Sequence, residues 1–183
     1  MRDMPLRHEH VDQLLKIDER WELRFTRTLD HPPVDVWSAL TEPERLRAWF
    51  PFGVEGECAP GARLRFLAPD GTEQAFEGEV TACDKPRRFE FRWGDGEHVR
   101  FDLEPTGMGT RLTLVNTIDE VGKAARDAAG WHVALDRLAA HLDGREPQPA
   151  PPDRFLELFR DYAEAFGDEA SSVEPPGPDA GSA

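Results

Sequence analysis

Large aromatic side chains recur at every second position in one stretch of this sequence, and such rings can build a small-molecule pocket. Phe89, Phe91 and Trp93 alternate with charged residues, and the apolar Val99 and Phe101 repeat the alternation in the next stretch. Ligand pockets are apolar, often aromatic hollows in which a few polar groups orient the ligand. The candidate lining residues from all predicted elements are Trp37, Trp49, Phe66, Phe89, Phe91, Trp93, Phe101, Trp131 and Leu135. Alternation alone predicts no more than a filled core, so both interpretations stay open.

Polar candidates for the rim of such a pocket are few. Glu79 and Asn116 lie in predicted strands, and His132 follows Trp131 in a predicted helix. His98 falls on the face of its strand opposite the apolar residues and is expected to face solvent. A general acid or base must be held against its reaction partner, and no pair here shows that arrangement. The sequence therefore favours binding over catalysis, names no catalytic residue and implies no cofactor.

Metal and phosphate chemistry find little support. His8-Glu9-His10 lacks a third ligand. Gly94-Asp95-Gly96 and Gly107-Met108-Gly109 are typical of turns, and neither precedes a helix as a phosphate-binding loop does. Cys58 and Cys83 lack metal-ligand spacing, and we expect them to be buried free thiols. The sequence predicts no metal site.

The charge of the chain excludes several partner classes. It carries 22 Lys and Arg against 36 Asp and Glu, a formal charge of −14. Such a chain repels nucleic-acid phosphates and anionic membranes. No stretch has the roughly 20 consecutive apolar residues that a membrane helix needs, and the N-terminus lacks the apolar segment of a secretory signal. We expect a cytoplasmic protein with neither nucleic-acid nor membrane partners.

The candidate rings are positioned by a predicted sheet and one long helix. From Trp21 the sequence alternates with period two, which predicts a strand to about Leu29. Thr41 followed by Pro43 and Glu44 is typical of a helix start, so two short helices are expected before residue 50. Six further strands are predicted at 52–58, 63–67, 72–83, 88–93, 98–103 and 111–117. Their short connections imply an antiparallel meander.

A helix over residues 123–143 completes this domain. Ala128, Trp131, Leu135 and Leu138 recur at three- and four-residue steps, and Gly144 ends the pattern. We therefore predict an α+β fold, a seven-stranded antiparallel sheet wrapped around a long C-terminal helix. The predicted order is an N-terminal amphipathic helix or arm, this domain, a proline-rich linker, an amphipathic helix and a disordered acidic tail, at 1–19, 20–144, 145–152, 153–167 and 168–183. The amphipathic helix covers its own domain or a partner; the linker length favours its own domain.

One segment carries a family resemblance. It is Val36-Trp37-Ser38-Ala39-Leu40-Thr41-Glu42-Pro43-Glu44-Arg45-Leu46, followed by Trp49-Phe50. This segment resembles the signature of the activator of heat-shock-protein-90 ATPase homologue-like family, in the SRPBCC superfamily. Pro60-Gly61, Gly78-Glu79-Val80 and Gly130-Trp131 match in order, and the resemblance spans about 21–144. Where many members carry a histidine after the last strand, Val115-Asn116-Thr117 stands here.

The resemblance implies a helix-grip, START-like (Bet v-like) fold, which is commonly hollow between its sheet and its long helix. With the aromatic pattern, it favours a non-catalytic protein that binds a small hydrophobic or aromatic ligand in that cavity. It also leaves open an enzyme resembling a polyketide cyclase or aromatase. A third alternative is a co-chaperone-type module that regulates a heat-shock-protein-90 ATPase. A homodimer and a chaperone partner both stay open.

Overall fold

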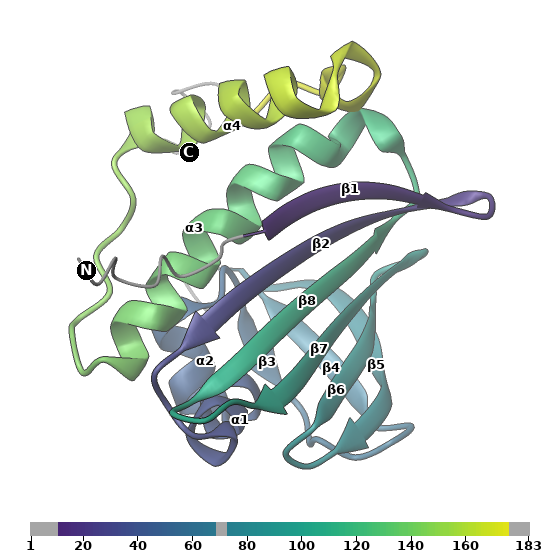
Figure 1. Cartoon of the computed structure of the whole chain (residues 1–183). Helices are drawn as coiled ribbons and strands as arrows, with labels where there is room; N and C mark the ends of the chain where they lie inside the picture. Colours follow the sequence, from purple (N-terminus) through teal and green to yellow (C-terminus); the bar gives the residue numbers. More distant parts are fainter. Residues whose placement is uncertain (1–10, 69–72, 176–183) are drawn as a thin grey trace, which may run out of the picture.

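One antiparallel sheet curls around a long helix in this chain (Figure 1). The computed structural model describes residues 11–68 and 73–175. The sheet has eight strands in the order β1-β2-β8-β7-β6-β5-β4-β3. Their bounds are β1 Val11–Ile17, β2 Arg20–Leu29, β3 Gly53–Glu55, β4 Arg63–Leu67, β5 Gln74–Asp84, β6 Arg88–Trp93, β7 Glu97–Pro105 and β8 Thr110–Ile118. The predicted α+β helix-grip class is confirmed, with eight strands in place of seven.

Alternating side chains give the sheet one buried face. In β7 Val99, Phe101 and Leu103 are buried, whereas the residues between them are half-buried. The cross-strand pair Phe89 and Phe101 brings two rings together on the inner face. Since successive side chains of a strand point to opposite faces, this pattern fixes the register of the central strands.

Helices cover the inner face and one end of the sheet. Their bounds are α1 Pro33–Thr41, α2 Pro43–Trp49, η1 Val121–Lys123, α3 Ala124–Leu142, α4 Pro152–Phe166 and η2 Asp168–Ser171. Figure 1 shows α3 crossing the sheet, α1 and α2 at one end, and α4 on the far side of α3. No helix in the described part of the chain combines the length and apolarity needed to cross a membrane.

The long helix packs through a stripe of small and large apolar residues. Ala124, Ala128, Trp131, Leu135 and Leu138 are all buried, and their three- and four-residue spacing places them on one side of α3. The small residues at the start let the helix approach the sheet closely. The helix ends where Gly144 takes a positive φ of 72° and donates its N–H to the carbonyl of His141.

The N-terminal segment corrects one expectation. Residues 11–17 form β1 instead of an amphipathic helix, and β1 pairs with β2 through partners such as Leu14 and Leu23. Seven residues are too few for hydrophobic spacing to separate a helix from a strand. Pairing with the free edge of β2 selects the strand, because it satisfies the backbone hydrogen-bonding groups of both segments. Residues 1–10, including His8 and His10, lie outside the described residues.

The C-terminal tail is ordered further than expected. Ala170 is buried within η2, and the N–H of Val173 donates to the carbonyl of Gly122 at 3.0 Å. These contacts hold residues 168–175 against the start of α3, so the expectation of disorder is wrong for this part. Residues 176–183 lie outside the described residues.

The two cysteines form a disulfide, which corrects the expectation of free thiols. Cys58 precedes β4 and Cys83 lies near the end of β5, with their Cα atoms 5.9 Å apart. The antiparallel pairing of β4 with β5 brings the second cysteine back beside the first. Their separation of 25 residues along the chain conceals this closeness in the sequence.

Candidate functional site

A cleft of about 750 Å³ opens where the β6–β7 turn meets the start of α3. We call it the aromatic cleft. Its apolar floor consists of five rings from separate segments, namely Phe52, Phe76, Trp93, Trp131 and Phe155. Its polar wall consists of Asp95, Glu97, Asn116, Asp119, Lys123, Arg126 and Asp127. The cleft therefore combines an aromatic surface with a charged rim.

Four of the five floor rings form a continuous cluster of touching rings. The centroids of Trp93 and Trp131 lie 5.4 Å apart with the rings nearly perpendicular, at 77°. Phe52 approaches Trp93 edge-on at 5.7 Å, and Phe76 stacks against the same indole at 5.6 Å. Perpendicular and offset arrangements are the favourable ones for aromatic pairs. The rings thus support one another and form a preorganised apolar surface.

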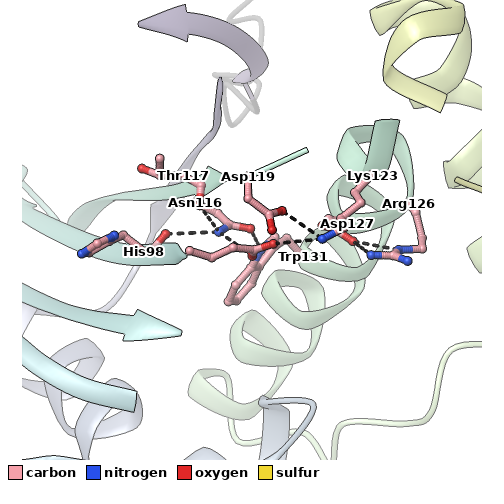
Figure 2. Close-up of polar contacts among 9 residues, drawn as sticks. His98, Asn116, Thr117, Asp119, Lys123, Arg126, Asp127 and Trp131 are labelled. Carbon is pink, nitrogen blue, oxygen red and sulfur yellow. Dashed lines mark hydrogen bonds and ion pairs between the residues drawn. The ribbon is translucent and has the colours of Figure 1, made fainter. Parts of the chain in front are cut away.

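A buried amide fixes the indole of Trp131. Asn116 on β8 is only 3% exposed, and its side-chain oxygen accepts the indole N–H of Trp131 at 2.9 Å. Its amide N–H donates to the backbone carbonyl of His98 at 3.1 Å. Figure 2 shows this link between β7, β8 and α3. The bonding also assigns which end of the amide carries the oxygen.

Two carboxylates of the wall lie in poorly solvated positions. The side chains of Glu97 and Asp127 are 21% and 19% exposed. Burial raises the pKa of Glu97 above its ordinary value of 4.5, and the negative charge of Asp127 raises it further. Burial also raises the pKa of Asp127, against the opposing effect of Arg126. Both carboxyls are therefore harder to ionise than exposed ones.

Two cations of the wall are each held by a carboxylate (Figure 2). Lys123 donates to Asp119 at 2.9 Å, and this hydrogen bond lowers the pKa of Asp119. Arg126 donates to Asp127 through Nε at 2.9 Å, and a terminal nitrogen of its guanidinium lies 2.8 Å from the same carboxylate in an ion pair. Lys123 also lies 3.9 Å from Glu97. The rim is thus a network of ion pairs around the mouth of the cleft.

The family of the chain follows from a direct comparison. Residues 30–143 match the model of the family described as activator of Hsp90 ATPase homolog 1-like protein. The chain belongs to this family. No curated protein matches the sequence.

Three solved structures show what this family member resembles. CalU16 from Micromonospora echinospora has a TM-score of 0.68 at 24% identity, covering 87% of this chain and 96% of CalU16. The BPP1335 protein of Bordetella parapertussis has a TM-score of 0.59 at 26% identity, covering 87% and 93%. DynU16, from the dynemicin biosynthetic locus, has a TM-score of 0.62 at 27% identity, covering 70% of this chain and 49% of DynU16. The CalU16 similarity, below 25% identity, shows the fold.

The structure brings together three of the predicted site residues. Trp93, Trp131 and Asn116 all line the aromatic cleft. The other predicted lining residues fill the closed core, which corrects the expected cavity; they are Trp37, Trp49, Phe66, Phe89, Phe91, Phe101 and Leu135. The space left among the central rings amounts to about 10 Å³. Close packing of rings explains this closure, because Phe50 contacts Phe66, Trp93 and Trp131. Phe66 and Phe101 also contact the two indoles directly.

Two predicted rim residues lie elsewhere. Glu79 is on the outer face of β5, 42% exposed, and forms an ion pair with Arg92. His132 lies between α3 and α4, where its Nδ1 is 2.8 Å from the hydroxyl of Tyr162. Burial lowers the pKa of His132. Both corrections have one cause: the faces of β5 and α3 that carry these side chains point away from the cleft.

Sequence reasoning missed the charged wall, although the signal was present. Glu97 has the same strand parity as the buried Val99, so its side chain leaves the sheet on the inner face. Lys123, at the end of η1, and Asp127 and Trp131 of α3 follow one another at four-residue steps and share one side of the continuous helical segment. Both patterns are visible in the sequence.

A segment outside the residues matched by the family model also contributes to the site. α4 and β1 lie outside the matched residues 30–143, yet α4 supplies Phe155 to the floor of the cleft. α4 is held to its own domain through Tyr162, whose hydroxyl donates to Asp12 of β1. Asp12 in turn accepts two hydrogen bonds from Arg27 of β2, at 2.5 and 3.3 Å.

Within residues 11–68 and 73–175, no group of three or more His, Cys, Asp or Glu side chains is arranged to hold a metal ion.

Proposed function

We propose that this protein binds a small hydrophobic or aromatic molecule in the aromatic cleft, without converting it. The observation that supports this proposal is a hollow of about 750 Å³ with a floor of five rings and a polar wall on one side. Ligand pockets typically have volumes of about 300 to 1,000 Å³ and this division between apolar and polar surface.

The floor offers a ligand an apolar surface that needs no rearrangement. The N–H of Trp131 is already bonded to Asn116, so a ligand that covers this indole leaves no buried donor unpaired. A planar apolar molecule lying on this floor would cover the exposed part of Trp93, which is only partly buried, beside Trp131, which is already 6% exposed. Since apolar burial contributes about 25 cal/mol per Å², the driving force comes from the apolar surface of the ligand and from the exposed parts of the floor rings.

The neighbouring structure DynU16 agrees with a small-molecule role. It comes from the dynemicin biosynthetic locus, and its similarity to this chain covers 70% of the residues here. A protein in a biosynthetic locus handles small molecules or the proteins that make them. This supports a small-molecule ligand without identifying it.

A second candidate function is acid–base catalysis on the bound molecule, as in a polyketide cyclase or aromatase. It is favoured by one observation, the raised pKa of both Glu97 and Asp127 beside an apolar surface. A carboxyl whose pKa is raised holds its proton more readily and is a better general acid than an exposed one. Turnover of a bound compound that is lost in Glu97→Gln while binding persists would favour this candidate.

The proposal is tested with a panel of apolar and aromatic compounds, monitored by melting temperature and tryptophan emission. A ligand at 100 times its Kd should stabilise the fold by about 2.7 kcal/mol. Binding should quench emission in the unaltered chain and in a Trp37→Phe control, whose ring lies against Phe89 in the core. The quench should shrink in Trp93→Phe. If no compound changes either signal, and the chain instead stimulates a purified Hsp90 ATPase, the interaction module replaces this proposal.

A further inference from the structure

We infer that the ligand of the aromatic cleft is an amine, whose ammonium group lies between Glu97 and Asp127 while its apolar body covers Trp93 and Trp131. This inference rests on the proposed function and adds the chemical class of the ligand. It is argued from where the carboxylates lie, what they are bonded to, and the charge of the wall around them.

Each carboxylate is placed beside one of the two indoles. Glu97 is the direct cross-strand partner of Trp93 at the β6–β7 turn, so both side chains leave the sheet on the same face. Asp127 precedes Trp131 by one turn of α3, on the same side of that helix. Because the two indole centroids are 5.4 Å apart, the two carboxylates converge on one end of the aromatic floor.

The carboxylates keep acceptor capacity that the protein does not use. A carboxylate can accept about four hydrogen bonds. Within the described residues, Glu97 contacts the amide of Asn116 at 3.5 Å and the ammonium of Lys123 at 3.9 Å, both long, and its carboxyl also shares a hydrogen bond with that of Asp119. Both short contacts from Arg126, one a hydrogen bond and one an ion pair, reach the same oxygen, Oδ1, of Asp127. The wall therefore offers acceptors to a ligand.

Each strong donor group of the wall already has an acceptor within the protein. The indole N–H of Trp131 is bonded to Asn116, and the amide of Asn116 donates to the carbonyl of His98. Lys123 is bonded to Asp119, and Arg126 to Asp127. A ligand that supplies hydrogen-bond donors complements this wall better than one that supplies acceptors.

The charge of the wall favours a cation. Four carboxylates, on Asp95, Glu97, Asp119 and Asp127, face two cations, Lys123 and Arg126, which gives the wall a formal charge of −2. The chain as a whole carries −14. The faces of indole rings attract cations, most strongly where water is excluded. An ammonium group would thus meet carboxylates and ring faces together, whereas an anion would meet two carboxylates at short range.

The test compares three probes that share a naphthalene body, namely naphthylmethylammonium, naphthylmethanol and naphthoate, by titration calorimetry with the full chain near pH 8. We expect the ammonium probe to bind at least about tenfold more tightly than the alcohol, the gain of one charge-assisted contact, and naphthoate to bind most weakly. Glu97→Gln and Asp127→Asn should each reduce this preference, measured as the ratio of the ammonium affinity to the alcohol affinity of the same variant. Glu79→Gln is the matched control, since Glu79 lies on the outer face.

The outcomes separate the two proposals. If the three probes bind with equal affinity, or if naphthoate binds most tightly, the inference is overturned and the proposed function stands. If none of the three binds, both are overturned. The comparison of the three probes on the unaltered chain tests the inference even if a variant does not fold.

Discussion

Trp131 donates its indole N–H to the side-chain oxygen of Asn116 at 2.9 Å, and this bond joins α3 to β8 at the base of the aromatic cleft. The residues are 6% and 3% exposed, so water cannot replace either partner. The same amide is held from its other side by the carbonyl of His98. One buried side chain therefore sets the distance between the helix and the sheet where the ligand is proposed to lie.

Asn116→Ala is expected to lower the free energy of unfolding by about 1–3 kcal/mol, because it leaves the indole N–H buried without an acceptor. Trp131→Phe removes the same bond from the other side. In a double-mutant cycle followed by urea denaturation, the double variant should cost less than the sum of the single ones. Thr117→Ala, at the next residue on the opposite face of β8, is the control. Strictly additive losses would show that the bond carries no coupling.

Most of the fold could be predicted from local patterns. The alternation of Phe89, Phe91 and Trp93 predicted residues 88–93 as a strand, the bounds of β6, and the apolar steps of the long helix placed it within one residue of α3. β1 could not be predicted, since Val11, Leu14 and Ile17 fit a helix as well as a strand and only pairing with β2 decides. The Cys58–Cys83 bond likewise depends on a register that spacing does not show.

The candidate site could be predicted only in part. The rings were recognisable as inward-facing, but whether rings fill a space or line it depends on the distance between sheet and helix. Here the rings of Phe50, Phe66 and Phe101 pack directly behind Trp93 and Trp131 and close the core. Phe155 could not be placed at all, since its helix returns to the domain through a linker with no local signal of where it docks. Glu97 was predictable from strand parity alone.

Phe155→Ala should weaken binding of an aromatic probe, because it removes one ring from the floor of the cleft. Losing most of the contact of one buried aromatic side chain corresponds to roughly 1–2 kcal/mol, a decrease in affinity of about five- to thirtyfold. Phe159→Ala is the matched control: Phe159 lies one turn further along α4, half-buried against the core. Both variants should lose some stability, measured by melting temperature, but only the first should lose affinity. Equal affinities of the Phe155→Ala and Phe159→Ala variants for the probe would show that Phe155 is not part of the binding site.

Reduction of the Cys58–Cys83 bond should destabilise the fold. The bond closes a segment of 25 residues that contains β4 and most of β5, and a loop of this length corresponds to about 3.5 kcal/mol of chain entropy in the unfolded state. The double variant Cys58→Ser/Cys83→Ser should show the same loss without reductant, and its melting temperature should not respond to dithiothreitol. Titration of the native, air-oxidised chain with a thiol reagent should detect no thiol. Two reactive thiols would contradict the pairing.

Glu97 should make stability depend on pH. Its pKa in the folded chain is raised by burial and by Asp127, while Asn116 and Lys123 oppose the shift. The folded chain therefore holds this proton more tightly than the unfolded one, and the free energy of unfolding falls as pH rises from about 4.5 through the raised pKa.

The variant Glu97→Gln, which cannot ionise, should match the stability of the unaltered chain near pH 4 and exceed it at pH 8. For a chain of this size, each 1 kcal/mol shifts the melting temperature by about 2–4 °C. Glu79→Gln removes only an exposed ion pair with Arg92 and should show no such gain. An unaltered chain that is more stable than Glu97→Gln at pH 8 would mean that the wall already compensates this carboxylate, and an ammonium ligand would then gain little from it.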